Sequence, residues 1–257
     1  MQKSVIFALI AIVIGVMLMS GCTTPGMKKD GKTVLISALQ KSKTITSSES
    51  AYDANIAASG LTIRLQTGLW MKDNVSRSDL TGSLLGIPLV VRYYTLEEGS
   101  YSCAQSDGNW TCKAGEDDSV TGLARPVSME GEDEQTILEM VAKGALVIQS
   151  EVTEGTYAGR KCDTVNMEID AAKLADIESN SELIDTANSM RESNVSKIAM
   201  VQCLDQETGY PLYFKMSMNI SSALGGSQEM VFEMTATKYI PNPSISSDVF
   251  TLPAEVE

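Results

Sequence analysis

The chain has 257 residues, with 20 lysines and arginines against 33 aspartates and glutamates, which gives a formal net charge of −13. An acidic chain is not expected to bind nucleic acid or to be held electrostatically on an anionic lipid surface. The absence of histidine excludes Ser-His and Cys-His triads and removes the most frequent zinc ligand. No Gly-rich phosphate loop occurs, and the acidic clusters lack the oxygen spacing of a calcium loop. We therefore expect a protein that is not an enzyme, with neither a cofactor nor a metal.

The first 22 residues have the three parts of a secretory signal. Lys3 precedes an apolar run that ends at Met19, and the small residues Ser20 and Gly21 lead to Cys22. The last four residues resemble a prokaryotic lipobox, with Met19 where leucine is usual. On this interpretation residues 1–21 are a signal peptide and Cys22 carries the lipid. The alternative is an uncleaved signal anchor, since the run approaches the ~18 residues that span a bilayer.

A lipidated Cys22 would anchor the protein on the extracytoplasmic face of a membrane, in the periplasm or at the cell surface. Residues 22–32 are small, polar and charged, and are typical of a short tether. Residues 33–257 are long enough for one domain with a sizeable core.

Hydrophobic periodicity in this domain predicts mainly strands. A helical period over residues 33–43 changes to a period of two from Ser50 onward. Strict alternation indicates a sheet with one dry and one wet face. We expect strands at 52–58, 63–72, 85–96, 145–151, 156–170, 197–204, 210–220 and 230–237, helices at 132–143 and 171–191, an acidic surface loop at 114–135, and a terminal arm after Pro241.

The four remaining cysteines form an even set, which suggests two disulfides in an oxidising compartment. Asp107-Gly108 is a favoured two-residue hairpin turn. Counting outward from that turn places Cys103 opposite Cys112 on a non-hydrogen-bonded pair, at a separation of about 4.5 Å that a disulfide tolerates. Four cysteines allow three pairings, and the hairpin favours Cys103–Cys112, which leaves Cys162–Cys203.

Methionine is the most unusual side chain on the expected apolar face. Met167, Met216, Met218, Met230 and Met234 fall on the apolar sides of strands. A methionine-rich surface adapts to apolar partners of varied shape, but methionine is also an ordinary core filler. Both interpretations remain open at this stage.

The order of elements resembles the LolA/LolB/LppX-type lipoprotein-carrier superfamily over residues 33–253. The resemblance lies in the helix SALQKSKTITS, the strands TYAGRKCDTVNMEID and YPLYFKMSM, and the closing NPSISSDVFTLP. It implies an α+β fold in which a strongly curved antiparallel sheet, an incomplete β-barrel, has helices plugging its concave side. The acidic loop at 114–135, the anchor and the expected disulfides depart from the soluble founding carrier.

The resemblance implies a membrane-anchored protein that binds lipid or another acyl-bearing ligand and hands it to a protein partner without covalent catalysis. A cell-surface sensor or protein-interaction module with a filled interior is the alternative. The expected ligand-binding residues are apolar side chains of the strands: Leu65, Leu69, Met167, Leu212, Phe214, Met216, Met218, Met230, Phe232 and Met234.

Overall fold

The computed structural model describes residues 29–84, 86–115, 134–174, 176–177, 188, 190, 194–221 and 227–256. The signal segment, Cys22 and nearly all of the expected acidic loop lie outside these ranges. Most of the expected helix at 171–191 also lies outside them.

The described residues form one large antiparallel sheet. Its order is β6-β5-β4-β3-β2-β1-β12-β11-β10-β9-β7, with β8 paired to β9 beside this path. The strands are β1 (Ser47–Ala58), β2 (Leu61–Lys72), β3 (Val75–Leu84), β4 (Ile87–Leu96), β5 (Gly99–Ser106), β6 (Asn109–Ala114), β7 (Leu146–Ile148), β8 (Thr153–Tyr157), β9 (Arg160–Asp170), β10 (Val195–Asp205), β11 (Pro211–Ser221) and β12 (Ser227–Pro241).

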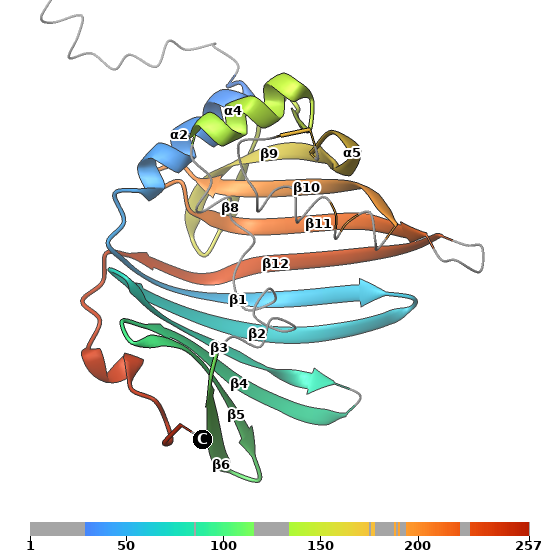
Figure 1. Ribbon diagram of the computed structural model, residues 1–257. Coiled ribbons are helices and arrows are strands. Elements are labelled where there is room, and N and C mark those ends of the chain that lie inside the picture. The colour runs from blue at the N-terminus through green and yellow to red at the C-terminus, as the bar shows by residue number, and fades with distance from the viewer. Residues whose placement is uncertain are drawn as a thin grey trace, which may run out of the picture.

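The sheet is curved and open (Figure 1). Its path ends at β6 on one side and at β7 on the other, so the barrel is incomplete. Register shifts interrupt the β1–β12 ladder between Ala51 and Tyr52, and the β10–β11 ladder between Cys203 and Leu204. Such bulges bend a strand and increase its twist, which suits a sheet that curves around a core. The prediction of an α+β incomplete barrel is confirmed.

In the part of the chain that the structure describes, three helices gather over the β7–β9–β10 end of the sheet (Figure 1). They are α2 (Gly31–Ser42), α4 (Glu134–Lys143) and the short α5 (Ala171–Leu174). Leu35 and Ala38 of α2 and Ile137 and Met140 of α4 are buried in the main core. Among the described residues, no helix has the length and hydrophobicity required to cross a bilayer.

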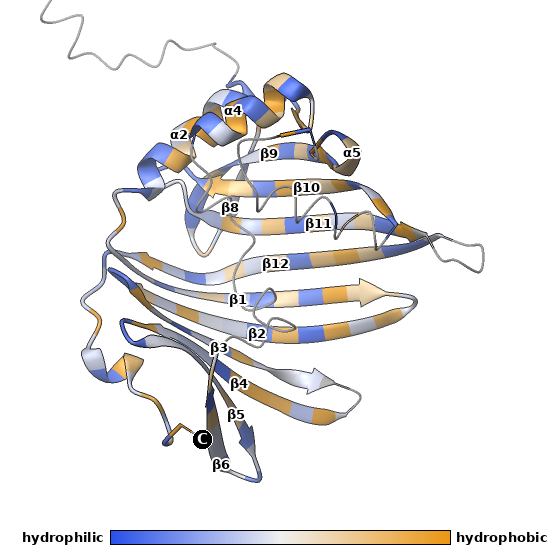
Figure 2. Cartoon of the chain, viewed as in Figure 1, coloured by the Kyte–Doolittle hydropathy of each residue, from blue (hydrophilic) through white to orange (hydrophobic). Residues whose placement is uncertain are grey.

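Hydrophobic and hydrophilic residues alternate along several strands (Figure 2), and their burial follows the predicted alternation. Tyr52 and Ala54 of β1 are buried, whereas Asp53 between them is exposed. In the ladder with β2, Ala54 lies opposite Leu65, which is buried as well. The expected apolar faces of β1 and β2 are therefore present in the fold.

The opposite face is not uniformly wet, which corrects the prediction of one dry and one wet face. Tyr94 on β4 is only 1% exposed, and it forms a second core with Cys103 and Cys112. Leu252 and Ala254 of the C-terminal arm pack against this core. The arm contains the 3₁₀ helix η1 (Ser247–Phe250), and Arg77 of β3 donates a hydrogen bond to the Val249 carbonyl at 3.1 Å. The arm thus covers the outer face of β3–β6.

Two strand predictions were wrong in detail. The strand β3 was not expected between the second and third predicted strands. It was missed because its Ser, Asp, Thr and Gly residues give little apolar alternation. The expected strand at 156–170 is the β8–β9 hairpin, which turns at Ala158 and Gly159 with positive φ.

Both predicted disulfides are present. Cys103 and Cys112 are register partners with a Cα–Cα distance of 4.1 Å, and Ser106 pairs with Asn109 beside the turn, as counted from the sequence. Cys162 and Cys203 join β9 to β10 with a Cα–Cα distance of 5.3 Å. Two disulfides indicate that the domain matures in an oxidising, extracytoplasmic compartment.

Candidate functional site: the apolar inner face

The candidate site is a set of apolar rows that cross the inner face from β9 to β2. In the central row, register pairing joins one residue from each of six neighbouring strands, in the order Met167, Met200, Met216, Phe232, Ile56 and Ile63. Five strand spacings of ~4.8 Å give this row a length of about 24 Å. A second row, Ile169, Ile198, Met218, Met230 and Ala58, lies beside it.

Burial changes along these strands. Leu65, Leu69, Met167, Leu212, Phe214, Phe232 and Met234 of the expected ligand-binding set are buried. Met216, Met218 and Met230 are only partly buried. The partly buried Met218 and Met230 lie toward the connection between β11 and β12, whereas the buried Phe214 and Met234 lie nearer the start of β11 and the end of β12. The structure therefore brings the expected residues onto one continuous face with an accessible side.

The accessible side of the inner face ends at two hairpin tips. Leu61 opens β2 after the β1–β2 turn and is 62% exposed, while Ile87 opens β4 and is 69% exposed. Each falls on the inner face by its register, since Leu61 is two residues from Ile63 and Ile87 two from Leu89. The apolar face thus continues to the rim of the sheet.

The members of the face that come from β10, including Ile198, were not expected from the sequence. Met200 lies between Met167 and Met216 in the central row, and the buried Gln202 follows it on β10. The strand at 197–204 was predicted, but its faces were not assigned. Met200 can be placed opposite Met167 and Met216 only when the register of β10 with β9 and β11 is known. The sequence pattern of β10 alone does not give that register.

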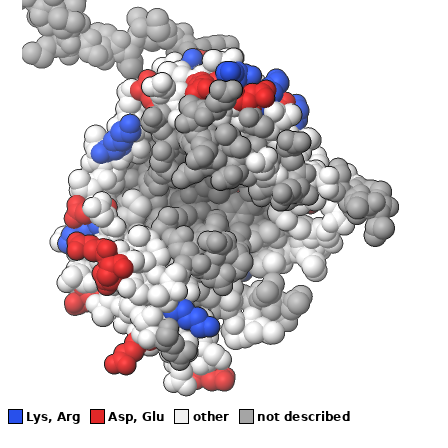
Figure 3. All heavy atoms as spheres, viewed as in Figure 1, with Lys and Arg blue, Asp and Glu red and all other residues white. Residues whose placement is uncertain are grey.

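Charged side chains lie at the margins of this view of the molecule (Figure 3). Lysines and arginines stand beside aspartates and glutamates over the α2–α4 end, and further charges follow the left and lower borders. Within the described ranges, no three histidine, cysteine, aspartate or glutamate side chains meet as a metal site requires.

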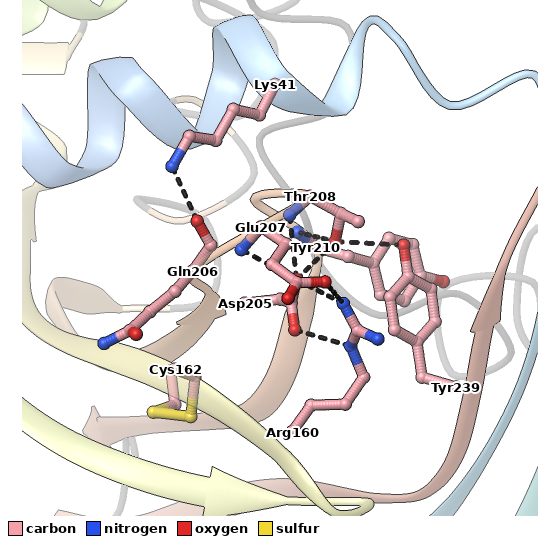
Figure 4. Close-up of polar contacts among 10 residues, drawn as sticks. Lys41, Arg160, Cys162, Asp205, Gln206, Glu207, Thr208, Tyr210 and Tyr239 are labelled. Carbon is pink, nitrogen blue, oxygen red and sulfur yellow. Dashed lines mark hydrogen bonds and ion pairs between the residues drawn. A yellow bond between two sulfur atoms is a disulfide. The ribbon is translucent and has the colours of Figure 1, made fainter. Parts of the chain in front are cut away.

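A buried polar cluster closes the α2 end of the inner face (Figure 4). Asp205 ends β10 with its side chain 1% exposed, and Arg160 donates two hydrogen bonds to it at 2.7 and 3.1 Å. Thr208 donates to the same carboxylate from both its backbone and its hydroxyl. Burial alone would raise the pKa of Asp205, but the hydrogen bonds from Arg160 and Thr208 hold that pKa below its ordinary value.

The turn that carries this cluster docks beneath α2. Gly209 has a φ of +75°, and a Cβ at this position would lie 2.1 Å from the Ala38 carbonyl oxygen. Lys41 of α2 donates to the Gln206 carbonyl at 2.7 Å. Tyr210 and Tyr239 stack beside the turn with centroids 4.4 Å apart. The cluster is fully paired and fixes the helix to the sheet, so its role is structural.

Described residues line cavities at two places in the fold that bear on the site. One of about 370 Å³ lies between α2 and the β9–β10 strands, where Lys29, Thr33, Lys41 and Asp163 are among its lining residues. The other, of about 660 Å³, crosses β1, β2 and β3 and is lined by three short stretches, residues 53–55, 64–66 and 81–83.

The fold and the apolar face define an open half-barrel with helices over one end. No protein-family model matches the chain, and no curated protein matches it. Among solved structures, Mycobacterium tuberculosis lipoprotein LppX is similar with a TM-score of 0.44 and 11% identity, over 82% of this chain and 97% of that one.

Two further solved structures are similar at comparable levels. The MucA/MucB complex of Pseudomonas aeruginosa has a TM-score of 0.42 and 12% identity over 86% of this chain, which spans only 60% of the matched chain. A DUF1329 family protein from Desulfovibrio piger has a TM-score of 0.35 and 11% identity, over 86% of this chain and 95% of that one. These similarities are distant, so the description of the fold as an open half-barrel with helices rests on the strand order and helices given above.

Proposed function

We propose that this protein is a lipoprotein, anchored through Cys22 on the extracytoplasmic face of a membrane, that binds lipid or another acyl-bearing ligand against its inner face. Residues 1–21 are its signal peptide, residues 22–32 its tether and the remainder its binding domain. Its role is to hold the ligand and transfer it to a protein partner, without covalent chemistry.

The observation that carries this proposal is the continuity of the apolar rows. The central row crosses six strands with no charged side chain among its members. Burying an acyl chain on such a face contributes ~25 cal/mol for each Å² removed from water, so no specific polar contact is needed to hold it. The partly buried Met216, Met218 and Met230 supply adaptable contact surface where the face is accessible.

A filled interior is the second candidate. Leu212, Phe214 and Met234 are at most 1% exposed, which is typical of a packed core. In that case the fold would serve as a cell-surface sensor or a protein-interaction module. The two candidates differ in whether the partly buried methionines contact a ligand.

Native mass spectrometry of protein purified without its anchor separates the two candidates, because a carrier is expected to retain lipid. A fluorescent fatty acid gives the affinity. Met218 pairs with Met230 and Ile198 on the inner face, so Met218→Asp should weaken fatty-acid binding at least tenfold. Asn219→Asp adds the same charge to an exposed position one residue away and should leave binding unchanged. Ligand-free protein that does not bind the fatty acid would instead support the interaction module.

A further inference from the structure

The point at which the chain enters the domain is fixed by three contacts at the N-terminal end of α2. Lys29 forms an ion pair with Asp163 of β9, with Nζ–Oδ distances of 2.7 and 2.8 Å. The Asp30 side chain caps the helix by accepting from the Thr33 backbone N–H at 3.2 Å. Gly31 is buried so closely that a Cβ would lie 2.2 Å from the Gln149 carbonyl oxygen.

The ion pair lies in a larger polar network. Asp163 is mostly buried, with 11% of its side chain exposed, and it also accepts from the Gln206 amide at 2.8 Å. Lys29 lies 3.6 Å from Glu154 of β8 as well. A cation held by a largely buried, doubly hydrogen-bonded carboxylate is restrained more strongly than an exposed surface pair. The chain therefore leaves the domain from a defined place beside β8 and β9.

The chain between this place and Cys22 is short. Seven peptide steps separate Cys22 from Lys29, and an extended chain covers at most ~3.6 Å for each, so the reach is about 25 Å. By contrast, β4 lies seven strand spacings from β9 in the sheet order, or about 34 Å along the curve at ~4.8 Å each. Figure 1 places α2 and β9 at one extreme of the molecule, with β4, β5 and β6 at the other.

We infer that the α2–β8–β9 edge is the membrane-facing surface of the anchored protein, with a lipid bilayer as its partner. This inference rests on the proposed anchor at Cys22. The edge is charged with both signs, since Glu151, Glu154 and Lys161 are all exposed on it. Such a surface suits contact with hydrated headgroups and not insertion into hydrocarbon, where unpaired charges are costly. The β4–β5 turn, with Glu97 and Glu98, faces away from the bilayer.

Fluorophores on single introduced thiols test this orientation on the full, lipid-anchored chain in vesicles that contain nitroxide-labelled headgroups. Glu151→Cys reports from the β7–β8 connection and Glu98→Cys from the β4–β5 turn, and both positions are exposed. The four domain cysteines are in disulfides, and a lipidated Cys22 has no free thiol, so only the introduced thiol reacts. We expect quenching at Glu151→Cys to exceed that at Glu98→Cys at least threefold.

A variant with ten Gly/Ser residues inserted after Thr24 is the matched control, because a longer tether frees the domain. Quenching at the two sites should then converge. Equal quenching with the native tether, or stronger quenching at Glu98→Cys, overturns the orientation. Membrane attachment that persists in Cys22→Ser overturns the anchor and the orientation together. Fatty-acid binding by the protein purified without its anchor tests the ligand proposal alone.

Discussion

The buried ion pair between Arg160 and Asp205 gives the sharpest prediction about stability. Asp205→Asn removes the negative charge but keeps nearly the same shape, so the Arg160 guanidinium then faces an amide that cannot neutralise it. Breaking a buried pair on one side costs about 3–5 kcal/mol. Arg160 keeps 23% of its side chain in solvent and a second partner in Glu207, which favours the lower end, about 3 kcal/mol. For a domain of this size the melting temperature should fall by about 6–12 °C.

Thermal unfolding followed by circular dichroism measures this shift, and Glu207→Gln provides the control. Glu207 bonds the same Arg160 at 2.7 Å but is 80% exposed, so its loss should cost at most about 1 kcal/mol. Because the pKa of Asp205 is depressed in the folded state, its contribution is complete above the unfolded value of ~3.9 and is lost as the pH falls through the folded value. The melting temperatures of the parent and Asp205→Asn should therefore begin to approach each other below about pH 4 and become equal only below the folded pKa of Asp205. If Asp205→Asn melts within about 2 °C of the parent at pH 7, or no lower than Glu207→Gln, the pair does not hold this end of the fold.

Two further predictions follow from the turn and the disulfides. Gly209→Ala combines a positive φ with a clash against the Ala38 carbonyl and should destabilise the domain by about 3 kcal/mol or more. The control Gly60→Ala has a φ of +79° and open space around it, so it should cost about 1–2 kcal/mol. Equal urea midpoints for the two variants would contradict the docking of this turn under α2. Removing Cys162–Cys203, which spans 41 residues, should cost about 1 kcal/mol more than removing Cys103–Cys112, which spans 9. Paired Cys→Ser variants in urea measure that difference, and the reverse order would show that loop entropy does not set it.

Local chemistry was enough to predict several parts of this fold. Asp107-Gly108 fixed a hairpin register from which the Cys103–Cys112 pairing could be counted. The alternation of Phe214, Met216 and Met218 likewise gave the correct face of β11. In both cases the information lies within a few residues of chain, where turn type and side-chain period act directly.

Other features depend on contacts between distant segments. Tyr94 is buried because the C-terminal arm, with Leu252 and Ala254, covers its face, and nothing near Tyr94 in sequence signals that cover. The strand β3 presents Ser76, Ser78 and Gly82 to the inner face. It forms a strand because it pairs with apolar strands on both sides, and its own sequence pattern does not predict this. Met200 entered the candidate site only through its register with two neighbouring strands.

The pairing of β1 with β12 has a consequence for how the protein is made. Tyr52 and Ala236 are register partners, yet roughly 180 residues of chain separate them, and loop-closure entropy opposes such contacts until late in folding. As the chain emerges, β2 can cover one edge of β1 early, while the other edge stays unpaired until nearly the whole domain is available. An unpaired strand edge with an apolar face is prone to self-association. The chain therefore has a long interval in which a chaperone that shields β1 would raise the yield of folded protein.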